Sequence, residues 1–313
     1  MKRIMSMSIA ALLLCAAVHP ASGAGDREQK SSIAISGAWA MYPTVVAWAE
    51  AFQKSHPQAR IDVSAGGAGK GAAEAIAGLV DIGMVSREPD PAELEKGITP
   101  IYILHDAVFP VISNKNAARG DILKTGIRRD AWIGMYASGA VGSWDDVVAT
   151  KTGAKIHVYT RSDACGAAAS WAAYLGKKQD DLKGIGVYGD PGLLQAAIRD
   201  PLGVGYCNFS YVFTREGGVV EGALLVPIDA NGNGIADADE VFKNRSQAID
   251  AIRKGRYPAT RKNYFYVKGA PRGPVKEFIE FALSEEGTKI VDETGTSLPL
   301  EKPEREEVLE GMR

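Results

Sequence analysis

A repeated order of β-prone run, glycine-containing turn and amphipathic helix most limits what this chain can fold into. Residues 32–37 form a β-prone run that ends in glycine, and residues 44–56 then carry apolar side chains at helical spacing. Residues 59–67 repeat the strand and its glycines, and the alanine-rich segment 71–80 follows as a helix. This alternation predicts an α/β fold, with a mostly parallel sheet that is covered by helices on both faces.

The same order returns after a charged and less regular segment at residues 117–130. The 313 residues, of which 46% are hydrophobic, are enough for two such units. We therefore expect two lobes, one from residues 31–111 and 262–313, the other from residues 112–261. The runs that support the later part of this prediction are the strands at 101–114, 155–160, 203–213 and 263–269, the helix at 166–176 and the two helices within 273–295.

The N-terminus has the layout of a secretory signal peptide. Lys2 and Arg3 precede an apolar run at residues 9–18, and small residues follow at 21–24. That run is too short for a bilayer core of about 30 Å, so we expect residues 1–24 to be removed and the protein to be exported. Lipidation of Cys15 is an alternative that the bulky Leu14 before it disfavours. The formal net charge of −2 provides no basic field and argues against nucleic acid as a partner.

Three turns between a strand and a helix, at residues 36–43, 65–71 and 160–168, share features of anion-binding loops. Glycine lets the backbone approach a ligand, and the first N–H groups of each following helix have no partner within that helix. Arg161 adds a guanidinium that suits an oxyanion, with Asp163 near enough to orient it. Ser86 and Arg87 end another strand. Each feature alone is more often an ordinary turn or a surface ion pair.

In this order and at these intervals, the segments resemble the substrate-binding proteins of phosphate ABC transporters, the phosphate branch of the periplasmic binding protein superfamily. The segments that carry the resemblance are SGAWAMYPTVVAWAEAFQKSHP, VSAGGAGKGAAEAIAGLVDIGMVSRE, YTRSDACGAAASWAAYLG, GVGYCNFSYV and YFYVKGAPRGPVKEFIEFALSEEGTKIVDETGTSLPL.

The resemblance implies a hinged, two-lobed type II periplasmic binding protein, with mixed or parallel sheets flanked by helices. Its anion would lie between the lobes, and its closed form would dock on a membrane permease. Arg161 matches the ligand arginine of the family and Asp163 its partner. The ligand-binding set expected on this basis is Ala38, Trp39, Ala40, Ala68, Gly69, Ser86, Arg87, Arg161, Asp163, Cys165, Gly166 and Ala167.

Several of these positions lack the hydroxyl groups that the family uses to hold phosphate. A hydrogen bond to a charged ligand contributes about 1.5 to 3 kcal/mol, so the loss of several predicts weaker phosphate binding. The positions that depart from Ser or Thr are Ala38, Trp39 and Ala40 in the first loop, Ala68 in the second, and Cys165 and Ala167 in the third.

Cys165 and Cys207 remain in the exported chain, in a compartment that permits disulfides. A disulfide between them is one expectation, and two buried, unpaired thiols are another. A third is that Cys165, at a helix N-terminus beside Arg161, has a lowered pKa and serves as a soft ligand.

The stretch DANGNGIADADE, residues 229–240, has the ligand spacing of a calcium loop. Gly234 stands at the sixth position, where such a loop turns sharply. A strand precedes the loop and no second copy exists, which favours a structural Ca²⁺ site over a sensor. A surface hairpin that binds no metal is the alternative. The expected ligands are Asp229, Asn231, Asn233, the carbonyl of Ile235, Asp237 and Glu240.

We therefore expect a monomeric periplasmic binding protein that delivers phosphate or a related oxyanion to an ABC transporter permease. We expect no enzyme activity, because no nucleophile and base stand together with a third group that would orient them. The alternative is a diverged scaffold or sensory protein that no longer binds phosphate and recognises another ligand or a protein partner.

Overall fold

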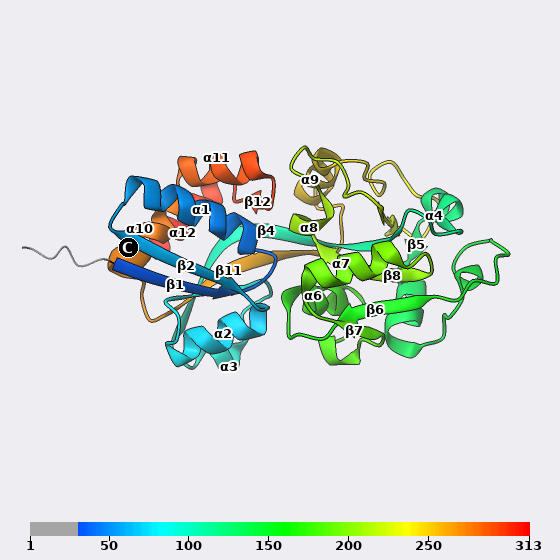
Figure 1. The fold of residues 1–313 in the computed structure, drawn as a ribbon, viewed down its shortest axis with the longest axis horizontal. Coiled ribbons are helices and arrows are strands. Elements are labelled where there is room, and N and C mark those ends of the chain that lie inside the picture. The colour runs from blue at the N-terminus through cyan, green and yellow to red at the C-terminus, as the bar shows by residue number, and fades with distance from the viewer. Residues whose placement is uncertain (1–30) are drawn as a thin grey trace, which may run out of the picture.

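The computed structural model describes residues 31–313, so the expected signal peptide and Cys15 lie outside it. These residues form two lobes that lie side by side along the longest axis of the molecule (Figure 1). One mixed sheet runs through both, in the strand order β2-β1-β3-β11-β4-β8-β6-β7. No helix within 31–313 has the length and apolar character that crossing a membrane requires.

The first lobe is built on a parallel unit of β2, β1 and β3, to which β11 and the first part of β4 add antiparallel. Helices cover both of its faces, as Figure 1 shows. Its strands are β1 (Ser31–Gly37), β2 (Ala59–Ala65), β3 (Ile82–Val85), β4 (Ile98–Ser113), β11 (Thr260–Lys268) and β12 (Leu298–Pro299). Its helices are α1 (Tyr42–Ser55), α2 (Ala68–Ala77), α3 (Pro91–Leu94), α10 (Gly273–Ala282), α11 (Glu285–Thr294) and α12 (Lys302–Gly311).

The second lobe continues from the later part of β4, which pairs with β8 and β9 antiparallel, while β6 pairs with β8 and β7 in parallel. Its strands are β5 (Ile127–Arg128), β6 (His157–Arg161), β7 (Ile185–Val187), β8 (Gly203–Asn208), β9 (Ala223–Leu225) and β10 (Ile228–Asp229). Its helices are α4 (Arg119–Thr125), α5 (Arg129–Ile133), α6 (Gly166–Tyr174), α7 (Gly189–Arg199), α8 (Phe209–Val212) and α9 (Arg245–Arg253).

Each lobe has its own hydrophobic core, and β4 passes from one core to the other. Leu104 packs in the first core, whereas Ala107 and the residues that follow it pack in the second. The sequence predicted the boundary between the lobes at residues 111 to 112. In the structure, Phe109 is already buried among aromatic side chains of the second lobe. A continuous apolar run contains no signal that separates its two cores, which explains the difference.

Close helix-to-strand packing in the first lobe depends on Gly71, in the first turn of α2. A Cβ at this position would lie 2.5 Å from the carbonyl oxygen of Met84 and 2.9 Å from that of Ser36. Any side chain would therefore push α2 away from β1 and β3. The glycines of the segment 65–71 bring a helix N-terminus close to the sheet edge, where the site lies.

Candidate functional site in the cleft between the lobes

The first and second predicted loops lie together at the carboxyl ends of β1 and β2. The carbonyl oxygen of Gly37 accepts hydrogen bonds from the N–H groups of Gly66 and Gly67, at 2.9 and 3.0 Å. Ala38 N–H donates to the carbonyl oxygen of Met84 at the end of β3, at 2.9 Å. These bonds fix both loops at the sheet edge that faces the second lobe. Open α/β sheets bind ligands at this edge.

Arg161, at the end of β6, is the buried cation of the opposite wall. Its Nε donates to Oδ1 of Asp163 at 2.8 Å, and its two terminal nitrogens donate to Asp163 and Asp190, each at 2.5 Å. The side chains of Arg161 and Asp190 are fully buried. Although burial by itself lowers the pKa of Arg161, the carboxylates of Asp190 and Asp163 raise it overall. Arg161 therefore stays charged, with two counter-ions of its own.

The two lobes are in direct contact around Arg161. Gly69 N–H, in the first turn of α2, donates to the carbonyl oxygen of Ala164 at 3.1 Å. A Cβ at Gly67 would lie 2.7 Å from that same oxygen, and one at Gly166 would lie 2.0 Å from the carbonyl oxygen of Ser86. The structure is therefore closed, and glycine on both sides makes this approach possible.

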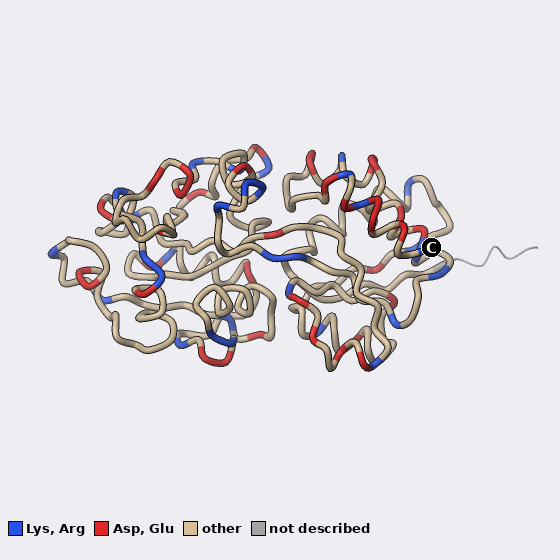
Figure 2. The backbone as a smooth tube through the Cα atoms, turned by 180° about the vertical axis from the view of Figure 1, so that it is seen from behind, with Lys and Arg blue, Asp and Glu red and all other residues tan. Residues whose placement is uncertain are grey.

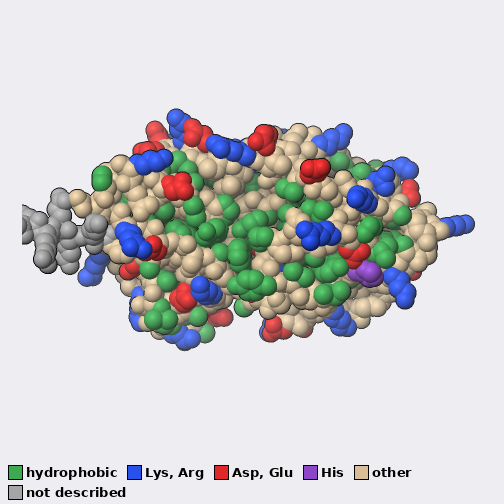
Figure 3. Space-filling view, viewed as in Figure 1, with side chains coloured by type: hydrophobic (Ala, Val, Ile, Leu, Met, Phe, Trp, Pro, Cys, Tyr) green, Lys and Arg blue, Asp and Glu red, His purple; other side chains and the backbone are tan. Residues whose placement is uncertain are grey.

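Trp39 reaches across the cleft from the first lobe. Its ring meets that of Tyr188 edge to face, with 6.0 Å between ring centroids, and its carbonyl oxygen accepts from the Tyr211 hydroxyl at 3.1 Å. A Cβ at Gly189 would lie 3.2 Å from Cζ2 of Trp39. Hydrophobic side chains also gather on the middle of the face in Figure 3, where the lobes meet. Trp39 thus occupies space between the lobes that a hydroxyl-bearing loop would leave open.

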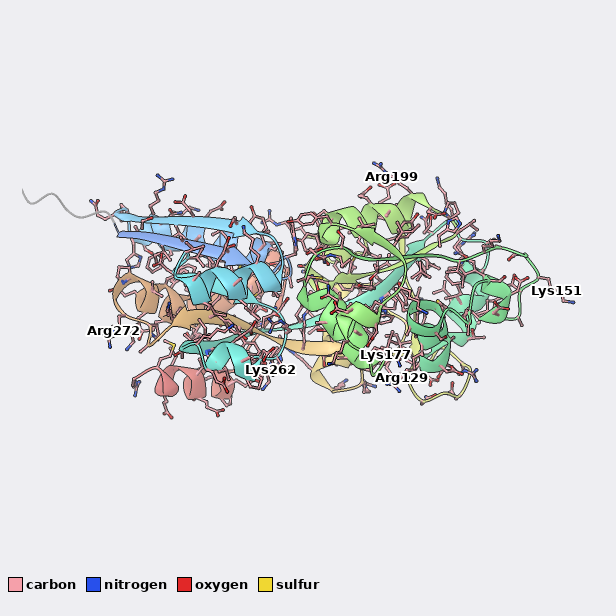
Figure 4. The ribbon with its side chains drawn as sticks, turned by 90° about the horizontal axis from the view of Figure 1, so that it is seen from below. Arg129, Lys151, Lys177, Arg199, Lys262 and Arg272 are labelled. Carbon is pink, nitrogen blue, oxygen red and sulfur yellow. The ribbon has the colours of Figure 1, made fainter. Side chains whose placement is uncertain are left out.

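Arg87 lies at the rim of the cleft and is engaged within its own lobe. It forms a two-pronged ion pair with Glu93, at 2.6 and 3.0 Å, and this bond raises its pKa. The rim is an open groove of about 600 Å³ that Arg87 shares with Lys177. Figure 4 shows Lys177 beside Arg129 on the side of the second lobe that faces the viewer. The groove gives solvent a path to the outer edge of the Cys165 loop, since Cys165 and Ala164 also line it.

The structure contains no disulfide between Cys165 and Cys207. Both thiols are free and buried. The lowered pKa expected for Cys165 is also wrong. Burial raises the pKa of the Cys165 thiol to about 12, and the nearby Arg161 offsets this only in part. Its Sγ caps α6 by accepting the Ala168 N–H at 3.5 Å. Cys165 therefore acts in the structure as a neutral helix cap.

Asp190, which follows Tyr188 and Gly189 at the start of α7, was not among the site residues expected from the sequence. Gly189 N–H donates to Oδ1 of Asp163 at 3.2 Å, and Oδ1 of Asp190 accepts the Asn208 N–H at 3.0 Å. The segment VYGDPG repeats the strand, glycine and helix order of the three predicted loops. The same rule, applied once more, would have found it.

A second buried arginine lies where the chain crosses between the lobes. Arg261 on β11 donates to Asp106 on β4 and to the side-chain oxygen of Asn208, and contacts Ser170 Oγ at 3.3 Å. Asn208 is also the residue whose N–H bonds to Asp190. The network that holds Arg161 therefore continues without a break to the two crossing strands.

The loop 229–240 lies in the second lobe, away from the cleft, where Ala236 N–H donates to the carbonyl oxygen of Lys124 in α4. Asp229 is buried and accepts N–H bonds from Gly232, Asn233 and Gly234, at 2.7, 3.1 and 2.9 Å. Within residues 31–313, no group of three or more His, Cys, Asp or Glu side chains is arranged to hold a metal ion. Asp229, Asp237 and Glu240 therefore do not form such a group, and the other expected ligands of the loop are two asparagines and a carbonyl oxygen.

The chain was compared with known proteins. A family model described as a PBP superfamily domain matches residues 22–286. The chain is 26% identical to the phosphate-binding protein PstS of Bacillus subtilis over 270 residues, which cover 86% of this chain and 81% of that protein. It is also 26% identical to PstS of Methanocaldococcus jannaschii, over 80% of this chain and 73% of that protein.

Solved structures show the same fold at lower identity. A putative phosphate ABC transporter substrate-binding protein from Clostridium perfringens, solved with bound phosphate, matches with a TM-score of 0.71 and 23% identity, over 87% of this chain and 100% of that one. An ABC-type phosphate transport receptor from Vibrio cholerae matches with a TM-score of 0.64 and 21% identity, over 86% and 100%. Because the family model spans residues 22–286, the chain belongs to the PBP superfamily.

Proposed function

We propose that this protein binds phosphate or a related oxyanion between its lobes and delivers it to an ABC transporter permease. The observation that carries the proposal is the buried Arg161, which faces the glycine loops of the other lobe. Its relatives are named as phosphate-binding proteins and not as enzymes, which supports a transport role.

The site differs from a hydroxyl-rich phosphate site in two respects that lower the expected affinity. Ala38 and Ala68 supply no side-chain donor, and both are buried. Arg161 already bonds to two carboxylates, so an incoming anion must share the guanidinium with them. Gly69 N–H and Ala168 N–H are already engaged, with the Ala164 carbonyl oxygen and Cys165 Sγ, so an anion would depend on the other backbone N–H groups at the first turns of the helices. We therefore expect phosphate to bind, more weakly than a site with hydroxyls would allow.

Titration calorimetry of residues 25–313 with phosphate, arsenate and sulfate tests this proposal. A variant that carries Ala38→Ser, Ala68→Ser, Cys165→Ser and Ala167→Thr restores the missing hydroxyls. Each recovered bond to a charged ligand contributes about 1.5 kcal/mol, or about tenfold in affinity, so the restored variant should bind phosphate more tightly. Submicromolar binding by the wild type would show that backbone donors suffice. The absence of binding by both forms would overturn the proposed function.

We further propose that the protein is exported to the periplasm, is monomeric and docks on its permease in the closed form. Two proteins with the same fold are named for ABC transport, the putative Clostridium substrate-binding protein and the Vibrio transport receptor, which supports the docking part of the proposal. Figure 2 shows that basic and acidic residues alternate along the backbone of both lobes. Cell fractionation with and without residues 1–24 tests the export, because the shortened chain should stay in the cytoplasm.

The loop 229–240 is proposed to hold a structural Ca²⁺ ion. Asp229 and Glu240 close the loop from its two ends, since Glu240 accepts the Ala230 N–H at 2.8 Å and the Asp237 N–H at 3.1 Å. Chelation should lower the unfolding temperature of the wild type and leave Glu240→Gln unaffected. Asp239→Asn is the matched control, because Asp239 is no expected ligand and pairs with Arg256 instead. If neither the chelator nor added Ca²⁺ changes the unfolding temperature of the wild type, the proposal is contradicted.

A further inference from the structure

The indole N–H of Trp39 is a buried hydrogen-bond donor without a partner. The chain has five tryptophans, and in residues 31–313 only Trp39 and Trp171 have a buried Nε1 that bonds to nothing. The other three indoles donate to backbone carbonyl oxygens, Trp48 to Gly287 at 2.9 Å, Trp132 to Ile127 at 3.1 Å and Trp144 to Leu202 at 3.3 Å. Three of the five indoles therefore have a backbone carbonyl oxygen as their acceptor, and two have none.

The two exceptions lie in different places. Trp171 is fully buried in the core of the second lobe, against the rings of Trp132 and Tyr206. Trp39 is partly buried, and its ring lies between the two lobes, against Tyr188. A ligand that enters the cleft can reach Trp39, whereas nothing from solvent reaches Trp171 without unfolding the core.

The indole edge of Trp39 lies beside Gly189 of the second lobe. A Cβ at Gly189 would lie 3.3 Å from Cε2, the ring carbon that is bonded to Nε1. Gly189 N–H in turn donates to Asp163, which holds Arg161. Gly189 is thus a shared neighbour of Trp39, from the first lobe, and of the Asp163 that bonds to Arg161, in the second lobe.

We propose that Nε1 of Trp39 donates a hydrogen bond to the oxyanion held between the lobes, which makes Trp39 a specificity-determining residue. The inference rests on the proposed function. A buried donor that lacks an acceptor costs free energy, and an oxygen of the ligand would remove this cost when it binds. Indole donates and cannot accept, so it favours a ligand oxygen that carries no proton. Its donor replaces a hydroxyl in a loop where Ala38 and Ala40 have none to offer.

Calorimetry with inorganic phosphate, arsenate and sulfate tests the proposal on wild type, Trp39→Phe and Trp171→Phe. Phe keeps an aromatic ring against Tyr188 but is smaller than indole, so the change removes the N–H together with part of the ring, as Trp171→Phe does in the core. We expect Trp39→Phe to weaken binding of the preferred anion by about tenfold or more. Trp171→Phe, which also removes an unpaired N–H, should leave that affinity unchanged. Equal affinities of wild type and Trp39→Phe would overturn this inference alone, and no binding by the wild type would overturn it together with the proposed function.

A spectroscopic measurement on the wild type keeps the test independent of whether the variant folds. The five indole ¹H–¹⁵N signals can be followed as phosphate is added, with the Trp39 signal assigned by its loss in Trp39→Phe or by selective labelling. The Trp39 signal should move and its proton should exchange more slowly with water, while those of Trp48, Trp132 and Trp144 stay in place. A Trp39 signal that does not move while phosphate binds would rule the contact out.

Discussion

At the scale of single residues, Arg161 has a structural duty besides any contact with a ligand. It is the partner of two buried carboxylates, Asp163 and Asp190. Arg161→Ala would leave both without a counter-ion, and breaking a buried pair in this way costs about 3 to 5 kcal/mol. We expect urea unfolding to show a loss of this size. Arg60→Ala, which breaks an exposed pair with Asp62, should cost about 1 kcal/mol or less.

Equal losses for these two variants would show that Arg161 does not balance the buried charge. The result also decides how anion titrations are interpreted. Loss of phosphate binding by Arg161→Ala identifies Arg161 as a ligand residue only if the variant is still folded at the temperature of the titration. Calorimetry should therefore be done after the unfolding experiment, without urea, at a temperature well below the unfolding temperature of the variant.

The two buried thiols give a second prediction at this scale. Burial raises the pKa of Cys165 to about 12 and that of Cys207 well above its ordinary value, so both are neutral thiols at pH 8. Because the thiolate is the reactive form, native residues 25–313 should react slowly with a disulfide reagent such as DTNB. When the protein is denatured without a reductant, two thiols should react with DTNB. Finding none in the denatured protein would mean that a disulfide forms after all.

Residue chemistry in the cleft was predictable where it follows a strand-to-helix turn. Glycine, helix N-termini and one arginine identified the loops at 36–43, 65–71 and 160–168, and the structure brings all three to the cleft. Sequence could not show that Arg87 pairs with Glu93, because that choice depends on how α3 packs beside β3. Nor could it show that burial outweighs the helix N-terminus at Cys165.

At the scale of elements, hydrophobic periodicity predicted the strands and helices that bury one face. The run at 101–114 is confirmed as the later part of β4, and the two C-terminal helices are confirmed as α10 and α11. The strand and helix pattern alone favoured a mostly parallel sheet, whereas the family resemblance included mixed sheets; β4 and β11 run antiparallel to their neighbours, so the sheet is mixed. The direction of each strand depends on the way in which the preceding connection returns the chain to the sheet. Local periodicity contains no information about these connections.

Elements that bury little were missed. α12 spans Lys302–Gly311, has no buried residue and attaches to β4 through an ion pair between Glu304 and His105, at 3.0 Å. The charged segment at 117–130 also folds, into α4 and β5. These segments pack few apolar residues against the cores, Val308 and Leu309 in α12, Ile122 in α4 and Ile127 in β5, so their periodic signal is weak, and their order comes from contacts with the rest of the molecule.

At the scale of the whole molecule, two strands connect the lobes, and a buried ion pair joins those strands. Asp106 on β4 and Arg261 on β11 pair at the crossing, and Arg261 also bonds to Asn208 of the second lobe. The pair lies beside the change of core along β4. Bending between the lobes must therefore occur around this fixed pair, and the strand pairing on its two sides can stay intact while the cleft opens.

Closure of the cleft should depend on the absence of a side chain at Gly166, the first residue of α6. A Cβ there would meet both the carbonyl oxygen and the hydroxyl of Ser86 on the other lobe, at 2.0 and 2.1 Å. Gly166→Ala should therefore hold the lobes apart without disturbing the core of either. Small-angle scattering should give a larger radius of gyration for this variant with phosphate present, and phosphate affinity should fall because donors of the first lobe stay out of reach.

Gly120→Ala is the matched control, since it lies in the first turn of another second-lobe helix where a Cβ meets nothing within 4 Å. If Gly166→Ala has the radius of gyration of the control, the closed arrangement of the lobes is not the form that the anion selects.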